Sequence, residues 1–189
     1  MLSIGRAHAD PIVLADGEGL QGRFEQSRHL RGFDKPIRST GQFFLLPKSS
    51  LIWQTERPFF TRMVIDNKGI SQSVEGAEVT RLDFDKFPGL QVMRSTLENS
   101  LSGNWAPLEK LTGSKLQPTG DKWSLRFTPK SSGLTLPFAY LSFEMSDYLE
   151  KVEIVKANGD KDVITFSQQK QAPVKEILEA AQKSRERQP

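Results

Sequence analysis

The chain has 189 residues, of which 37% are hydrophobic and 26% are charged, with a net charge of +3. This length fits one domain, and no run approaches the roughly 18 apolar residues that a membrane-spanning helix needs. The 26 Lys and Arg residues nearly balance the 23 Asp and Glu residues and are scattered, unlike the basic stripe typical of nucleic-acid-binding proteins, and the absence of cysteine excludes disulfides and thiolate zinc sites.

The first ten residues predict export. Ala7-His8-Ala9, followed by Asp10, fits the small-x-small pattern of a signal-peptidase site. Only six residues precede this pattern, whereas a leader needs an apolar segment of roughly 7–15 residues. We therefore expect a truncated signal peptide with cleavage near Ala9, so that residues 1–9 are a residual leader or a disordered N-terminus. The alternative is a chance match in a frayed N-terminus.

The first half of the chain predicts strands. Residues 11–20 fit a short helix weakened by two glycines, and from Arg23 the apolar period falls to two, which is typical of a strand. After a loop at 32–36 we expect strands at 37–46 and 51–55. A hairpin should follow over residues 61–74, with its tip at Asp66-Asn67-Lys68-Gly69.

The period becomes helical after Pro88. One helical face is marked at three- and four-residue steps by Val92, Met93, Thr96, Leu97 and Leu101, and Gly103 ends the pattern. A second, shorter helix is marked by Trp105, Leu108 and Leu111 and ends near Gly113. The sequence therefore predicts a pair of helices in the middle of the chain.

Strands return in the last third. We expect a hairpin over 114–130, a strand at 138–145, and a hairpin over 149–166 whose Asn158-Gly159 pair suits a tight primed turn. Weak amphipathic spacing of Val174, Ile177, Leu178 and Ala181 assigns residues 171–189 to a short helix and a mobile tail. The outline is one antiparallel sheet with a helical insertion, an all-β or α+β domain over residues 10–170.

Two segments are apolar on both faces, "FFLL" at 43–46 and "LIW" at 51–53. An antiparallel strand has this pattern when both of its sides are covered. The two-helix insertion is the spare apolar surface that we expect to cover the second side. A sheet curled around helices can close completely and give an ordinary core, or close incompletely and leave an apolar cleft, and the pattern leaves both outcomes open.

Five short strings occur in order between about residues 22 and 166: "RFEQ", "RSTGQFF", "LIWQTERPF", "VID" and "WSLRFTPK". In order, spacing and element type they resemble the LolA-like family of periplasmic outer-membrane lipoprotein carriers. The resemblance implies a mainly β (α+β) fold, an open antiparallel half-barrel curled around a lid of short helices.

The resemblance also implies a function without catalysis, cofactor or metal. A member of this family shelters acyl chains of lipoproteins in a hydrophobic cavity. It carries them through the periplasm from an inner-membrane ABC transporter complex to an outer-membrane anchored acceptor. Because this chain lacks the cysteine that such an acceptor uses for its lipid anchor, it resembles the soluble carrier. We also expect the protein to be a monomer. A carrier of another lipid or lipid-like molecule is the alternative.

Candidate site residues follow from the resemblance and the strand pattern. The cavity is assigned to Phe24, Phe43, Leu45, Leu51, Trp53, Met63, Ile65 and Phe143, and the lid to Met93, Leu97, Leu101, Trp105 and Leu108. Each could equally be ordinary core. Thr128-Pro129-Lys130 matches a strand-ending motif of the family. Where the family places a gating Arg, this chain has Pro47-Lys48, so Lys48 is the gating candidate, although its ammonium lacks the planar fork of Arg.

Two other functions are alternatives. A hydrolase using a serine and His29 is disfavoured because the chain contains no G-x-S-x-G elbow. A nucleic-acid-binding β-barrel would use the basic residues of the first strands beside aromatic side chains, namely Arg23, Arg28, Arg31, Lys35 and Arg38. We expect no nucleic-acid partner, because these charges fit the solvated face of a curved sheet.

Overall fold

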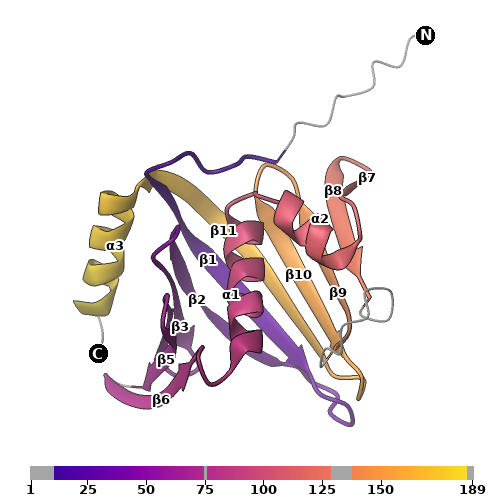
Figure 1. The fold of residues 1–189 in the computed structure, drawn as a ribbon. Coiled ribbons are helices and arrows are strands. Elements are labelled where there is room, and N and C mark those ends of the chain that lie inside the picture. The colour runs from indigo at the N-terminus through magenta and orange to yellow at the C-terminus, as the bar shows by residue number, and fades with distance from the viewer. Residues whose placement is uncertain (1–10, 75, 129–137, 187–189) are drawn as a thin grey trace.

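The computed structural model describes residues 11–74, 76–128 and 138–186 (Figure 1). The expected cleavage site near Ala9, the Pro129-Lys130 part of the strand-ending motif, and the last three residues of the expected tail lie outside the described residues.

In the part of the chain that the structure describes, eleven strands form one open antiparallel sheet. They are β1 (Glu18–His29), β2 (Ile37–Leu46), β3 (Ser50–Arg57), β4 (Thr61–Ile65), β5 (Gly69–Val74), β6 (Ala77–Asp83), β7 (Gln117–Thr119), β8 (Lys122–Phe127), β9 (Phe138–Met145), β10 (Leu149–Lys156) and β11 (Lys161–Pro173). Their order is β6-β5-β4-β3-β2-β1-β11-β10-β9-β8-β7, so β6 and β7 are the edge strands among the residues described. The predicted open half-barrel is confirmed, and the pairing of β1 with β11 places both ends of the domain at its centre.

Two of the three helices in the described ranges follow one another across the inner, concave side of the sheet (Figure 1). They are α1 (Pro88–Leu101) and α2 (Ala106–Thr112), and the third is α3 (Val174–Glu186). Pro88 begins α1, where the missing N–H costs nothing, and Gly113 ends α2 in the left-handed region with φ of 67°. The helix pair predicted from the sequence is confirmed.

The prediction of a helix over residues 11–20 is wrong. Residues 11–15 are irregular and β1 begins at Glu18. The backbone N–H of Ile12 donates to Asp147 O and that of Leu14 to Ser102 O, at 2.8 and 3.0 Å. Gly103 accommodates this segment, because a Cβ there would lie 2.0 Å from Ile12 O. These tertiary hydrogen bonds satisfy backbone N–H groups that would be satisfied within the segment if it were a helix.

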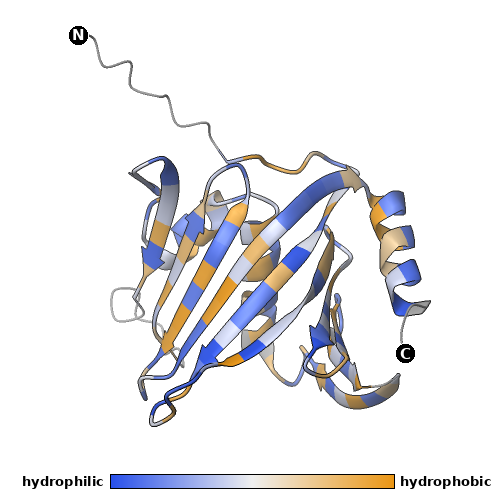
Figure 2. Ribbon diagram, turned by 180° about the vertical axis from the view of Figure 1, so that it is seen from behind, coloured by the Kyte–Doolittle hydropathy of each residue, from blue (hydrophilic) through white to orange (hydrophobic). Residues whose placement is uncertain are grey.

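The second apolar face of "FFLL" and "LIW" lies under α3, not under α1 and α2 as expected. Side chains of β2 and β3 alternate, so one set packs inward, while the outward set forms a separate cluster with α3 that contains Phe44, Leu46, Ile52, Ala172, Ile177 and Ala181. Figure 2, which views the sheet from behind, shows the alternation of hydrophobic and hydrophilic residues along the strands. We call the outward side chains Phe44, Leu46 and Ile52 the outer patch; α3 is its cover.

Polar contacts fix the end of α3 to the sheet. The buried Gln54 of β3 accepts hydrogen bonds at its Oε1 from Arg62 Nη1, at 2.8 Å, and from Ser184 Oγ, at 2.9 Å. Burial and the neighbouring charge of Arg185 lower the pKa of the Arg62 guanidinium. Since a buried amide is stable only when it is hydrogen-bonded, Gln54 ties β3, β4 and α3 together.

The outer face also carries a glutamate that couples stability to pH. Glu56 accepts hydrogen bonds from Arg23 Nη2, at 2.8 Å, and from Gln42. Burial alone would raise the pKa of Glu56, but these hydrogen bonds and the charges of Arg23 and Arg57 outweigh burial, so the pKa lies below its ordinary value. A depressed carboxyl pKa stabilises the folded state above the unfolded-state pKa, and this contribution is lost as the pH falls through the folded-state pKa.

We therefore expect Glu56→Gln to flatten the decline of Tm as the pH is lowered from about 6 to about 3. The substitution keeps the size of the side chain and removes the titrating group. Thermal unfolding followed by circular dichroism at several pH values measures the slope. A variant whose Tm declines as steeply as that of the parent would show that Glu56 does not contribute to acid sensitivity.

Candidate functional site

One end of the concave face is densely packed. This closed end holds the chain turns at 47–49 and 146–148, residues 11–15 and α2. Its buried apolar residues include Leu20, Leu45, Leu101, Trp105, Leu108, Phe143, Met145 and Leu149. The Trp105 and Phe143 rings meet edge to face with centroids 5.5 Å apart. The two helices are therefore anchored on the sheet at this end.

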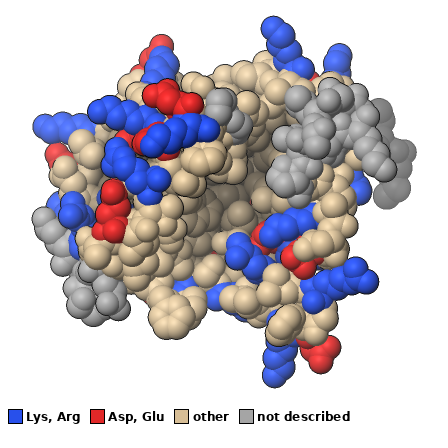
Figure 3. Space-filling model, turned by 60° about the horizontal axis from the view of Figure 1, so that its bottom comes forward, with Lys and Arg blue, Asp and Glu red and all other residues tan. Residues whose placement is uncertain are grey.

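The other end of the concave face is hollow. We call it the mouth; it is bounded by the β1–β2 loop at residues 30–36 and the β10–β11 turn at 157–160. Figure 3 views the molecule from this side and shows a hollow lined by uncharged residues, with charged side chains around it. Apolar residues of the same core cluster stay partly exposed, namely Trp53, Met63, Leu82, Leu90, Leu97, Phe138, Leu141, Ile154 and Ile164. Partly covered apolar surface of this kind can accept an apolar ligand.

The eight residues assigned to the cavity all belong to, or pack against, this one cluster. Phe24, Phe43, Leu45, Leu51, Ile65 and Phe143 are buried, and Trp53 and Met63 are partly exposed. Trp53 stacks on Phe24 with ring centroids 4.0 Å apart, and Phe166 meets both Trp53 and Phe43 edge to face. The structure thus gathers the predicted residues into one floor, in which Trp53 and Met63 have exposed surface; their role in binding stays a prediction.

The five residues assigned to the lid separate into two groups. Leu101, Trp105 and Leu108 are buried and Leu97 is partly buried, whereas Met93 is 45% exposed and lies outside the cluster. Each step of four residues turns the position by about 40° around a helix of 3.6 residues per turn. Met93 is therefore rotated about 80° from Leu101. The helical spacing from Met93 to Leu101 is therefore not straight along the helix, and Met93 lies off the inner face that Leu101 occupies.

Lys48 contacts the lid through its backbone. Its N–H donates to Glu98 Oε1 of α1 at 2.6 Å, while its Nζ donates to Asp16 Oδ1 at 3.1 Å. The side chain is 85% exposed. The contact between the β2–β3 turn and α1 is thus a main-chain hydrogen bond, and a gating role for the Lys48 ammonium stays a prediction.

The basic residues weighed for nucleic-acid binding are divided between the two faces. Arg23 pairs with Glu56 and Arg38 with Glu25 on the outer face, whereas Arg28 pairs with Asp162 on the concave face. His29, weighed as a catalytic base, is exposed at the end of β1. Among the described residues, the division of these arginines between two faces gives no continuous basic groove of the kind that binds a nucleic-acid strand.

Sequence reasoning missed a polar cluster at the mouth. Asp162 of β11 is buried on the concave face and accepts hydrogen bonds at Oδ1 from Arg28 Nε, at 2.8 Å, and Gln26 Nε2, at 3.2 Å. Lys156 Nζ of β10 lies 3.6 Å from Asp162 Oδ2. The signal was present in the sequence, because Asp162 has the same period-two register as Ile164 and Phe166 and so places a charge on an apolar face.

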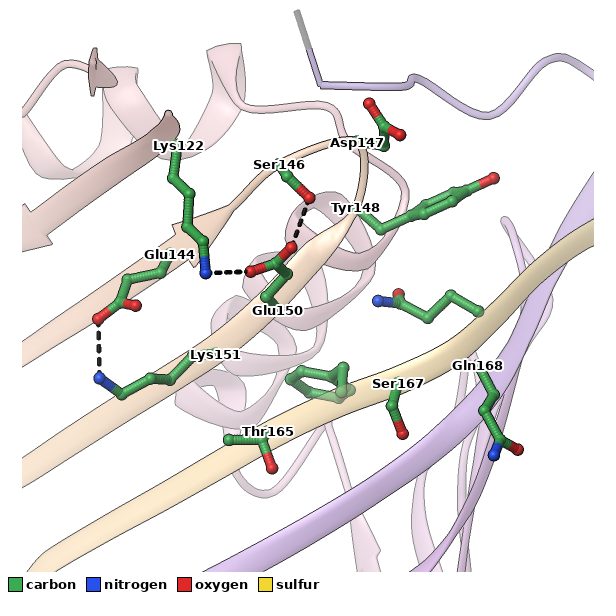
Figure 4. Close-up of a pocket in the computed structure, with 12 residues that line it drawn as sticks. Lys122, Glu144, Ser146, Asp147, Tyr148, Glu150, Lys151, Thr165, Ser167 and Gln168 are labelled. Atoms are coloured by element: carbon green, nitrogen blue, oxygen red, sulfur yellow. Dashed lines mark hydrogen bonds and ion pairs between the residues drawn. The ribbon is translucent and has the colours of Figure 1, made fainter. Parts of the chain in front are cut away.

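A second hollow, of about 430 Å³, lies where β10 and β11 diverge beyond the Lys151–Thr165 pair (Figure 4). Lys122 Nζ is 2.6 Å from Glu150 Oε2, and Lys151 Nζ is 2.7 Å from Glu144 Oε1. Hydrogen bonds from Lys122 and Ser146 outweigh the effect of burial and lower the pKa of Glu150. Since these four charges neutralise one another and the lining is largely polar, the mouth is the stronger candidate for an apolar ligand.

Among the described residues, no group of three or more His, Cys, Asp or Glu side chains is placed to hold a metal ion. None of the described helices is long and apolar enough to cross a membrane.

Comparisons with solved structures find distant likenesses to this fold. A LolA superfamily protein from Nitrosomonas europaea is 10% identical over 86% of this chain and 89% of its own, with a TM-score of 0.41. A DUF1329 family protein from Desulfovibrio piger is 9% identical over 80% and 85%, with a TM-score of 0.42. LprF from Mycobacterium bovis is 12% identical over 78% and 85%, with a TM-score of 0.36.

Sequence comparison places the chain in a family. No curated protein matches it significantly. A family model described as "Outer membrane lipoprotein carrier protein LolA" matches residues 16–178, from just before β1 into α3, and so includes every strand and both inner helices. The chain therefore belongs to the LolA family.

Proposed function

We propose that the protein is a periplasmic carrier that shelters acyl chains of lipoproteins, or of related lipids, on its concave face. The observation that carries this proposal is the partly covered apolar surface that opens at the mouth, beneath α1. Family membership supports it, because the matching family is described as an outer membrane lipoprotein carrier. Burial of each methylene group contributes about 0.8 kcal/mol, so a chain of modest length supplies a favourable free energy of binding.

The proposed cycle needs no catalytic group. An acyl chain enters at the mouth and contacts the partly exposed floor around Trp53, Met63 and Ile164. Leu90 and Leu97 of α1 pack against the same cluster. Loading exchanges one apolar contact for another, so affinity stays moderate and the cargo can be released. We propose that cargo is received from an inner-membrane ABC transporter complex and delivered to an outer-membrane anchored acceptor.

Mass spectrometry of lipid that co-purifies with the protein tests this function directly. The full chain, isolated from cells under native conditions, is expected to carry acylated molecules in near-stoichiometric amount. The spectrum also distinguishes lipoprotein-derived chains from other lipid-like cargo. Recovery of the protein without bound lipid, together with failure to bind any apolar probe in solution, would refute a carrier role.

A matched pair of substitutions on β11 locates the binding face. Ile164 is a partly buried member of the concave cluster, while its neighbour Val163, also half-buried, points to the outer face. We expect Ile164→Asn to weaken binding of the neutral probe N-phenyl-1-naphthylamine about tenfold, because an amide without a partner replaces apolar contact. Val163→Asn should leave the affinity unchanged. Fluorescence titration measures both, and equal losses would place the probe elsewhere.

A further inference from the structure

Two strands and a loop bring positive charge to one side of the mouth. Arg28 comes from the end of β1 and Lys156 from the end of β10, and both approach Asp162 of β11. The Arg31 side chain lies over the adjoining turn, since its Cδ would be 3.9 Å from a Cβ at Gly159. We call Arg28, Arg31 and Lys156 the mouth cations.

Two carboxylates face these three cations. Asp162 is 5% exposed and is held by Arg28 Nε and Gln26 Nε2. Asp160 accepts hydrogen bonds at Oδ1 from the Arg31 N–H of the β1–β2 loop and at Oδ2 from Asn158 Nδ2 of its own turn. Within this set of five groups one positive charge is left over. The two cations beside Asp162 remain open to solvent, since the side chains of Arg28 and Lys156 are 48% and 38% exposed.

Asp162 positions Arg28 and Lys156 but does not use all of their hydrogen-bond donors. A guanidinium carries five N–H donors, and the contact with Asp162 is made through Nε. The separation of 3.6 Å between Lys156 Nζ and Asp162 Oδ2 is longer than a hydrogen bond. Both side chains can therefore donate to a further acceptor while the buried carboxylate fixes their place.

The polar cluster adjoins the apolar floor. Asp162 pairs in register with Ile154 of β10, and Ile154 pairs with Leu141 of β9. Ile164 lies two residues along the same face of β11, about 6.6 Å away by strand geometry. All three apolar residues are partly exposed members of the concave cluster. A ligand whose chain covers them places its polar end beside the mouth cations.

From this juxtaposition we infer that the mouth is an anion site, and that the cargo is an amphiphile whose long apolar chain ends in a carboxylate or a phosphate. The inference rests on the proposed function, since the chain must occupy the concave face. It narrows the cargo class: the surplus charge attracts an anionic end, is indifferent to a neutral one and repels a cationic one. Arg suits carboxylate and phosphate because its donors match their paired oxygens.

The test compares amphiphiles of equal chain length and different head. Displacement of N-phenyl-1-naphthylamine from the full chain is measured with hexadecanoate, hexadecyl phosphate, hexadecanol and hexadecyltrimethylammonium, each below its micelle concentration. We expect the two anions to bind at least about tenfold more tightly than the alcohol at low salt, and the preference to shrink as salt screens it. Inorganic phosphate alone should displace nothing, because it has no chain.

Two arginine variants connect the preference to the mouth. Arg28→Gln is expected to remove most of the preference for anions while the affinity for hexadecanol stays as in the parent. Arg38→Gln is the matched control, because Arg38 pairs with Glu25 on the outer face and is more exposed; its preference should persist. Circular dichroism confirms that both variants are folded.

The possible failures are distinguishable. If no amphiphile displaces the probe, the carrier function fails and the anion site fails with it. The carrier function stands and the anion site is overturned in two cases. In one, all four amphiphiles bind with equal affinity. In the other, Arg28→Gln lowers the affinity for hexadecanol as much as the affinity for hexadecanoate. Displacement by inorganic phosphate alone would show an anion site that does not serve an amphiphile, and would overturn the cargo class.

Discussion

Replacing Ile177 with Asp is expected to detach α3 from the sheet. Ile177 is 1% exposed and packs, with Ala181, on the outer patch. Gly19 lets the helix approach this closely, since a Cβ there would lie 3.1 Å from Ile177 Cγ1. An unpaired carboxylate buried at this position costs several kcal/mol, so the helix should leave the sheet instead.

Loss of this cover has a second consequence. The outer patch of β2 and β3 becomes exposed, and exposed contiguous apolar surface promotes association between molecules. We expect Ile177→Asp to lower the free energy of unfolding by about 3 kcal/mol or more and to produce concentration-dependent oligomers. Denaturant unfolding measures the first effect, and light scattering coupled to size-exclusion chromatography measures the second.

The adjacent Leu178 is the control. It is 42% exposed on the same helix, so Leu178→Asp should change the unfolding free energy by no more than about 0.5 kcal/mol and should leave the protein monomeric. If both variants behave alike, α3 does not cover the sheet in solution and the outer patch is exposed in the parent protein as well.

The strand pattern predicted the sheet because its signals are local. Period-two alternation gives the strands from β1 to β4, and Asn158-Gly159 gives the turn between β10 and β11, where Gly159 adopts a φ of 91°. The order of the strands is not local. The central pairing of β1 with β11 joins Glu18 to Pro173, and no feature near either residue specifies it.

The same limit explains why the role of α3 was missed. Its inner face is built from Ile177 and from Ala181, a residue of small apolar area, so the helix looked weakly amphipathic. Its partners Phe44 and Ile52 lie more than a hundred residues earlier. The apolar residues on both faces of β2 and β3 correctly predicted that both sides of the sheet are covered. However, α1 and α2, which are nearer in sequence, cover only the inner side, and α3 covers the outer side.

The candidate site was predicted in part for a related reason. Aromatic and branched residues at alternate positions identify a buried face, and the floor around Phe24, Phe43 and Trp53 follows from that pattern. Whether the face is sealed depends on how far α1 extends over it, which is set by packing at the closed end. The polar cluster around Asp162 depends on pairing between β1, β10 and β11, which only the assembled sheet brings together.

Truncation of Trp105 to Ala is expected to be the most destabilising change among the five lid residues. Trp105 immediately precedes α2, is buried, and packs edge to face on Phe143. Its indole N–H has no hydrogen-bond acceptor among the described residues, so the loss is one of packing. Large-to-small changes of this kind cost about 3–5 kcal/mol. Urea unfolding measures the cost, with Met93→Ala as the control, expected to remain within about 0.5 kcal/mol.

The contrast between these two variants also shows which end of the lid is fixed. Trp105 belongs to the closed end, whereas Met93, nearer the mouth, lies outside the apolar cluster. If α1 is anchored only at its C-terminal end, hydrogen exchange in the parent should be faster near Met93 than near Leu101, and Trp105→Ala should accelerate exchange along the whole helix. A Trp105→Ala variant that keeps the stability and exchange pattern of the parent would show that the helices are held by other contacts, and the closed end would lose its role as the anchor of the lid.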